Sequence, residues 1–132
     1  MLNFDYAFSP TVRAIQAERG SRAGYAKREA SHDLGNELVP DVAEFIRRAN
    51  SAYLGTVSAD GQPYIQHRGG PAGFLKIVDD RTIGFADYVG NRQFITTGNL
   101  KDNPKAFLFI MDYAHRRRLK IWGEARTTTD PA

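Results

Sequence analysis

The fold of this chain is decided by residues 81–126, which read RTIGFADYVGNRQFITTGNLKDNPKAFLFIMDYAHRRRLKIWGEAR. This stretch predicts a strand, a glycine turn, a helix that begins at Asn91-Arg92-Gln93, an Asn-Pro break and a cationic hairpin. The first turn of a helix has unpaired N–H groups and a partial positive charge, and an arginine at this position opposes the helix dipole. A bound phosphate would remove that conflict. The stretch therefore predicts a phosphate-binding site around Arg92, and an ordinary loop with a solvated Arg92 is the alternative.

The composition is that of a soluble globular protein. With 132 residues, the chain is long enough for one domain with one core. Because it has no cysteine, disulfides, thiolate metal sites and cysteine nucleophiles are excluded. No apolar run approaches the roughly 18 residues of a membrane span, and the start of the chain lacks a signal-peptide core. We therefore expect a single domain, residues 1–132, in a cytoplasmic protein that does not enter a membrane.

The first 50 residues are predicted to be mostly helical. Ser9 and Gly20 are suitable N-cap and C-terminal residues for a helix over Pro10–Arg19. A more polar helix is expected over Ser21–Ala30, and residues 31–39 are expected to connect it to the next element.

A helix over Pro40–Ala49 is the clearest of the expected helices. Val42, Phe45, Ile46 and Ala49 follow the i, i+3, i+4, i+7 spacing of a helix with one buried face. Asn50 is expected to end it in a left-handed conformation.

Strands are expected in pairs over residues 51–128. Asp60-Gly61 is a strong turn signal between the first two strands. Six strands in three hairpins, with a helix over Asn91–Leu100 before the third, favour a mainly β (α+β) fold built on a small antiparallel barrel. The expected strands are Ala52–Ser58, Pro63–Arg68, Phe74–Val78, Thr82–Ala86, Ala106–Tyr113 and Arg117–Thr128.

A glycine-rich segment, residues 66–74, separates two of these strands. Its glycines, Gly69 and Gly70 among them, either form a wide bend or let the backbone approach a planar ligand closely. The ligand interpretation gains support because Arg68 enters the segment and Lys76 follows it.

The densest positive charge lies at Arg116-Arg117-Arg118 and Lys120. Alternation along a strand places Arg118, Lys120 and Trp122 on one face. Such a run is usually a solvated hairpin face, but it could also line a groove for an anionic cofactor or a second subunit, or contact nucleic acid.

Several kinds of site are not indicated by the sequence. The spacing of His32, His67 and His115 matches no common zinc pattern, so we predict no metal site. The chain also has no G-x-S-x-G elbow, no G-x-G-x-x-G after a strand and no Walker loop.

The order of these parts resembles the pyridoxamine-5'-phosphate-oxidase-like family of FMN-binding split barrels. The resemblance covers roughly residues 43–126 and is closest at Phe85-Ala86-Asp87-Tyr88-Val89-Gly90-Asn91-Arg92-Gln93. It implies a six-stranded antiparallel split β-barrel, with Arg92 on the FMN phosphate and with Lys76 and Arg118 near the flavin. The implied cofactor-binding residues are Arg68, Gly69, Gly70, Lys76, Asp87, Asn91, Arg92, Gln93 and Arg118.

The chain departs from the oxidase of this family in several places. Gln93 stands where the family has a second basic residue, Asp87 where it has threonine and Asn91 where it has serine. No R-x-x-P-type substrate signature occurs before Ala132. The chain therefore resembles the oxidase-related flavoproteins, whose His-Arg-Gly-Gly-Pro segment is similar to residues 66–74, more than the oxidase itself.

We therefore expect an FMN-dependent oxidoreductase that forms a homodimer with the cofactor at the interface. Its partner would be a small organic molecule or NAD(P)H, and no catalytic acid or base stands out. The alternatives are a non-enzymatic flavin- or haem-binding module, with His67 as the nearest axial ligand, and a deazaflavin-dependent reductase. A nucleic-acid-binding module is supported only by the arginine run, so we expect no nucleic acid partner.

Overall fold

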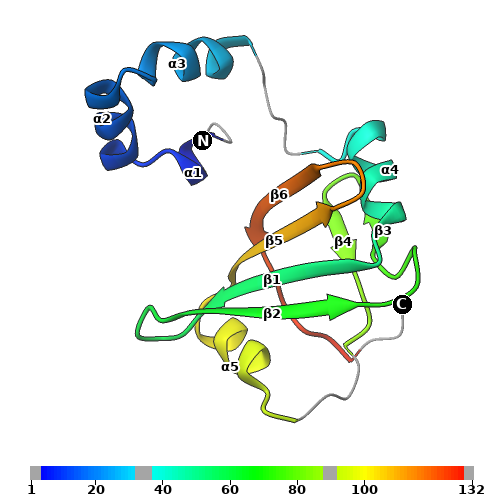
Figure 1. Cartoon of the computed structure of the whole chain (residues 1–132). Helices are drawn as coiled ribbons and strands as arrows, with labels where there is room; N and C mark the ends of the chain where they lie inside the picture. The colour runs from blue at the N-terminus through cyan, green and yellow to red at the C-terminus, as the bar shows by residue number, and fades with distance from the viewer. Residues whose placement is uncertain (1–3, 32–36, 88–91, 130–132) are drawn as a thin grey trace. The chain divides into compact units, whose positions relative to one another are not determined.

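The computed structural model describes residues 4–31, 37–87 and 92–129. The chain forms two compact units, Met1–Leu38 and Val39–Ala132. No helix in the described ranges is both long and apolar enough to cross a membrane. The elements shown in Figure 1 are α1 (Phe4–Ala7), α2 (Pro10–Arg19), α3 (Arg22–Ser31), α4 (Pro40–Arg48), β1 (Ser51–Val57), β2 (Pro63–Gly69), β3 (Lys76–Asp79), β4 (Thr82–Gly84), α5 (Ile95–Asp102), β5 (Lys105–Asp112) and β6 (Arg117–Glu124).

The first unit consists of α1, α2 and α3. The Ser9 side chain caps α2 by accepting a hydrogen bond from the Val12 backbone N–H at 3.2 Å. Gly20 ends that helix in a left-handed conformation, with φ of 87°. Both predicted caps are confirmed, and α3 begins one residue later than expected. The predicted connector, residues 31–39, lies largely outside the described residues.

Aromatic and ionic contacts hold these three helices together. The rings of Phe8 and Tyr25 meet edge to face, with centroids 5.4 Å apart. Arg13 forms an ion pair with Asp5 at 2.6 Å. The unit is thus stabilised by contacts among its own side chains.

In the second unit, α4 buries Ile46 of the predicted apolar face, leaves Val42, Phe45 and Ala49 partly exposed, and also buries Ala43, which the spacing does not predict. Ile46 is fully buried and Ala43 is 5% exposed. The predicted left-handed end at Asn50 is wrong, because α4 ends at Ala49 in extended backbone with ψ of 138°. The chain enters β1 immediately afterwards, and the Asn50 carbonyl accepts a hydrogen bond from the Gly70 N–H at 3.1 Å.

The six described strands form two antiparallel sheets. A four-stranded sheet has the order β2-β1-β5-β6, and β3 pairs with β4 in a two-stranded sheet (Figure 1). The three predicted hairpins are therefore present: β1–β2, β3–β4 and β5–β6. The described fold is a mixed α+β structure with antiparallel sheets.

The central strand β1 determines which side of the larger sheet is buried. Its residues alternate, so that Ala52, Leu54 and Thr56 are buried while their neighbours are partly exposed. In the register of the sheet, Leu54 lies opposite Leu108 of β5. These side chains line the inner face of the sheet, to which Ile110 also belongs.

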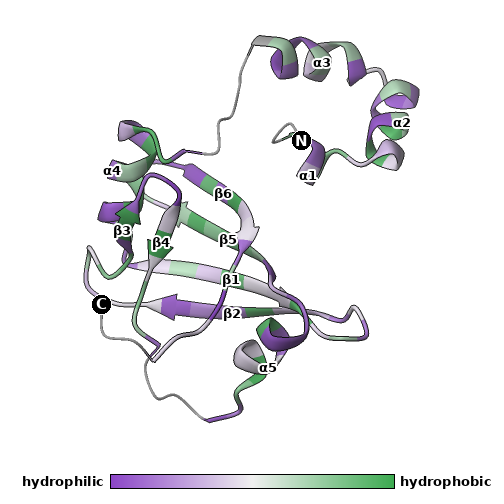
Figure 2. Cartoon of the chain, turned by 180° about the vertical axis from the view of Figure 1, so that it is seen from behind, coloured by the Kyte–Doolittle hydropathy of each residue, from purple (hydrophilic) through white to green (hydrophobic). Residues whose placement is uncertain are grey.

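The inner face also determines the placement of β2. Tyr64, Gln66 and Arg68 lie opposite Thr56, Leu54 and Ala52, so they share the inner face. Three of the seven residues of β2 lie on this side, and Figure 2 shows the second half of the strand as hydrophilic. The edge strand β2 therefore places polar side chains on the inner face of the sheet.

Helix α5 begins later than the sequence predicts. We expected a helix from Asn91 to Leu100, but α5 starts at Ile95 and ends at Asp102. Arg92 and Phe94 have positive φ values of 62° and 55°, a conformation that no helix interior contains. The prediction that Arg92 belongs to the first turn of a helix is therefore wrong, and Asn91 lies outside the described residues.

Replacing Ile46 by alanine tests the packing of α4. We expect the free energy of unfolding to fall by about 2–5 kcal/mol, because the change leaves a cavity at a fully buried position. Urea denaturation gives this quantity. The control is Val78→Ala, at a side chain that is 64% exposed, for which we expect a loss within about 0.5 kcal/mol. Equal losses for both variants would contradict the observed core.

Candidate functional site

Arg68 is the centre of a polar cluster on the inner side of β2. Its side chain is only 15% exposed. One terminal nitrogen, Nη1, lies 2.6 Å from Asp87 Oδ1, and the other, Nη2, donates to Gln66 Oε1 at 2.9 Å. The cluster therefore links β2 to the segment that follows β4.

Gln66 is in turn fixed by α5. The Thr96 hydroxyl donates to Gln66 Oε1 at 2.6 Å, so this oxygen accepts two hydrogen bonds. Deeper in the same region, Asn99 Nδ2 donates to Thr56 Oγ1 at 3.0 Å, and both residues are buried. These bonds attach α5 to the sheet through side chains that orient Arg68.

The guanidinium of Arg68 has one nitrogen without a partner. Its Nε is buried and has no hydrogen-bond acceptor among the described residues. The Phe85 ring lies beside the group, with the guanidinium carbon 5.9 Å from the ring centroid. A buried N–H without an acceptor is costly, and an oxygen atom of a ligand would satisfy it. We call Gln66, Arg68, Phe85, Asp87 and Thr96 the Arg68 cluster.

Only part of this cluster is predicted from the sequence. Arg68 and Asp87 are predicted site residues, whereas Gln66, Thr96 and Phe85 are not. The two-residue spacing of Gln66 and Arg68 places both on one strand face and was the available signal. Thr96 had no such signal, because its role depends on how α5 docks on the sheet.

The two predicted glycines of the site make room for protein side chains. A Cβ atom on Gly70 would lie 2.8 Å from Phe74 Cβ, and one on Gly69 would lie 3.0 Å from His67 Cε1. Gly70 therefore requires glycine for reasons of packing, whereas a side chain at position 69 would require the His67 ring to move slightly. This geometry agrees with the bend interpretation of the segment.

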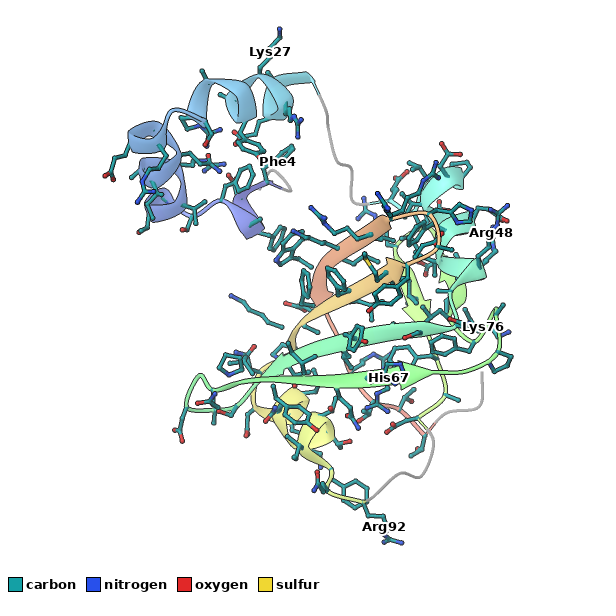
Figure 3. The ribbon with its side chains drawn as sticks, viewed as in Figure 1. Phe4, Lys27, Arg48, His67, Lys76 and Arg92 are labelled. Atoms are coloured by element: carbon teal, nitrogen blue, oxygen red, sulfur yellow. The ribbon has the colours of Figure 1, made fainter. Side chains whose placement is uncertain are left out.

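Arg92 and Gln93 lie outside any helix. Arg92 is exposed, and its guanidinium carbon is 5.9 Å from the centroid of the Phe94 ring. Figure 3 shows its side chain directed away from the sheet and far from Lys76. Arg92 and Lys76 are therefore not close to each other within one copy of the chain.

Lys76 and Arg118 occupy two further strands. Lys76 is exposed at the start of β3, opposite Gly84. Arg118 is exposed on β6, opposite Met111. By strand alternation, Arg118 lies on the outer face of the larger sheet, whereas Arg68 lies on the inner face. One copy of the chain therefore presents these arginines on opposite faces.

The outer face of the larger sheet carries several aromatic side chains. The rings of Phe107 and Trp122 meet edge to face, with centroids 5.0 Å apart. The ring centroids of Phe107 and Phe109 are 6.4 Å apart. Trp122 is 41% exposed and Ile65 is 68% exposed. As predicted, Trp122 shares this face with Arg118 and Lys120. We call Tyr53, Ile65, Phe107, Phe109 and Trp122 the aromatic face.

Two of the three histidines lie in the described ranges. The Nε2 atom of His67 is 2.8 Å from Ser51 Oγ, and its ring contacts Tyr53 edge to face. His115, in the β5–β6 turn, lies 2.9 Å from the Asp112 carboxylate, and this hydrogen bond lowers the pKa of Asp112. Within the ranges that the structure covers, no three His, Asp or Glu side chains are grouped as metal ligands would be.

Comparison with known proteins identifies one family. A protein-family model described as pyridoxamine 5'-phosphate oxidase matches residues 38–132. No curated protein matches the chain.

Two solved structures resemble the chain, both of tagged HupZ from Group A Streptococcus. A single-substitution variant is 23% identical, with a TM-score of 0.57, and the match covers 72% of this chain and 74% of that one. The other form is 24% identical, with a TM-score of 0.56 and coverage of 70% and 67%. At this identity the likeness shows a shared fold.

Replacing Gly70 by alanine tests the packing interpretation. We expect a loss of about 1–3 kcal/mol in the free energy of unfolding, because the new methyl group overlaps the Phe74 side chain. The control is Gly98→Ala in α5, where a Cβ meets nothing within 4 Å. That change should stabilise the protein by about 0.5–1 kcal/mol. Urea denaturation measures both, and an unaffected Gly70→Ala protein would contradict the packing role.

Proposed function

Because the chain belongs to the pyridoxamine 5'-phosphate oxidase family, we propose that it is an FMN-binding split-barrel flavoprotein. We further propose that it is an oxidoreductase related to, but distinct from, the oxidase. The observation that carries the proposal is the largely buried side chain of Arg68, whose Nε lacks an acceptor among the described residues. A phosphate oxygen is the acceptor that suits an arginine best.

The described residues fit an anionic cofactor. Arg68 is held in place by Gln66, and a planar ring, Phe85, already lies beside it. Lys76, Arg92 and Gln93 are exposed, and Lys76 pairs through its backbone with Gly84. In our proposal Arg68 and Arg92 hold the phosphate and Lys76 faces the flavin, with Gly69, Gly70 and Asn91 completing the site and Asp87 lying beside Arg68.

When bound, FMN supplies the redox chemistry. The residues of the chain bind and orient the cofactor and shield it from water. We propose no acid or base among the side chains, since hydride transfer to a flavin requires none. We propose a small organic molecule or NAD(P)H as the reaction partner.

A homodimer is part of the proposal. Arg68 and Arg118 lie on opposite faces of the larger sheet, so a single copy does not direct both toward the same small ligand. We propose that two copies pair through the outer face, which also carries Arg118. The aromatic face offers the apolar surface that such an interface needs.

A haem-binding module is the second candidate. It is favoured by His67, an exposed imidazole on the same side of the sheet as the aromatic face, whose Nε2 contacts the Ser51 hydroxyl. Haem requires an axial ligand of this kind. A visible spectrum separates the two candidates, since bound haem gives a strong Soret band and bound flavin does not.

Titration with FMN, followed by flavin fluorescence and absorbance, tests the first proposal. We expect Arg68→Met and Arg92→Ala each to weaken FMN binding by about 10- to 100-fold, because each removes a charge-assisted hydrogen bond to phosphate. Arg126→Met, at another exposed arginine, is the matched control and should bind as the unaltered chain does. Unaltered protein that binds no FMN would reject the proposal, and unchanged affinity in a variant would reject the role of that residue.

The dimer proposal is tested by replacing Trp122 with glutamate. We expect a dimer for the unaltered chain and a monomer for this variant, because a charge would be buried in the interface. Sedimentation equilibrium measures the mass, and circular dichroism checks the fold. Val78→Glu, at an exposed residue on the other sheet, should remain dimeric. A dimer that survives Trp122→Glu would place the interface elsewhere.

A further inference from the structure

We propose that Asp87 is a built-in competitor for the anion that Arg68 binds, an inference that rests on the proposed FMN function. The Asp87 carboxylate lies 2.6 Å from Arg68 Nη1 and so occupies one side of the guanidinium. A phosphate that takes the Nη1 position of the guanidinium, in addition to the unpartnered Nε, must displace Asp87. Because of this competition, an anion binds tightly at Arg68 only if it also makes contacts elsewhere on the protein.

The two partners differ in how firmly they are held. The Arg68 side chain is 15% exposed, whereas that of Asp87 is 54% exposed. Asp87 lies three residues beyond the end of β4, in backbone that is neither helix nor strand. Its carboxylate can therefore rotate into water when an incoming phosphate takes its place on the buried guanidinium. When an anion binds, we therefore expect Arg68 to keep its position and the Asp87 carboxylate to move away from it.

The hydrogen bonds to Gln66 explain why Arg68 remains directed when Asp87 leaves. Gln66 Oε1 accepts from Arg68 Nη2 at 2.9 Å, and the Thr96 hydroxyl holds that same oxygen at 2.6 Å. Thr96 is buried, with 5% exposure, on a helix attached to the sheet by the Asn99–Thr56 hydrogen bond. Gln66 and Thr96 are therefore positioning residues for the guanidinium.

The charge of Asp87 has a consequence for selectivity. A carboxylate beside the binding arginine repels any incoming anion that does not displace it. Inorganic phosphate can offset the repulsion by Asp87 only through its contacts with the arginines. FMN gains further contacts through its ring and chain, so it is favoured over small anions. Removing the charge should strengthen the binding of both phosphate ligands and leave riboflavin, which lacks phosphate, unchanged.

The experiment compares Asp87→Asn with the unaltered chain. FMN and riboflavin binding are measured by fluorescence quenching, and inorganic phosphate binding by the rise in thermal unfolding midpoint. We expect Asp87→Asn to bind FMN about 3- to 10-fold more tightly, and to show a larger stabilisation by phosphate. Riboflavin affinity should not change. The matched control is Asp60→Asn in the β1–β2 turn, which removes the same charge from an exposed residue. It should change neither the affinity for FMN nor the stabilisation by phosphate.

A second pair of variants tests the positioning residues. Thr96→Val removes the hydroxyl that holds Gln66 while keeping the shape of the buried side chain, and Thr96→Ser retains the hydroxyl. We expect the valine variant to weaken FMN more than riboflavin, and the serine variant to restore the ratio of the two affinities. A merely structural role would weaken both ligands equally.

The outcomes separate this inference from the proposed function. If the unaltered chain binds FMN but Asp87→Asn binds it no more tightly, the competitor role is wrong and the FMN function stands. If FMN does not bind, a larger phosphate stabilisation in Asp87→Asn that Arg68→Met abolishes would still support competition at Arg68. If neither ligand responds to the loss of Asp87, the pair is an ordinary ion pair and the inference is rejected.

Discussion

The two-sided pairing of β1 is the constraint on which the rest of the second unit depends. This strand bonds to β2 on one edge and to β5 on the other, and its alternating burial fixes the inner face of the whole sheet. Because directly opposed residues in antiparallel strands share a face, the register forces Gln66 and Arg68 inward. A shift of one residue in the β1–β2 register would place Arg68 on the outer face and separate it from the other residues of the Arg68 cluster.

The sequence reveals those features that depend on local pattern. The helical spacing around Ile46 and the turn at Asp60-Gly61 predict α4 and the first hairpin, because burial periodicity and turn chemistry are local. The start of α5 is not predictable in this way. Left-handed φ values at Arg92 and Phe94 interrupt the helix, and non-glycine residues carry little signal of such a conformation.

The candidate site shows the same division. Arg68 and Asp87 are nineteen residues apart in sequence, and their ion pair depends on how the segment after β4 returns to β2. Thr96 is thirty residues from Gln66. Residue types can suggest that an arginine binds an anion, but neither composition nor spacing indicates which groups hold it in place. The contribution of the structure is therefore the set of partners around each charge, together with the face of the sheet on which each charge lies.

The aromatic face also has an optical consequence. The chain contains one tryptophan, and that residue, Trp122, is 41% exposed beside Phe107 on β6. Indole emission shifts to shorter wavelength when water is removed from around the ring. The tryptophan fluorescence of this protein therefore comes from a single position on one surface. Any partner or ligand that covers that surface changes the emission without a label or a substitution.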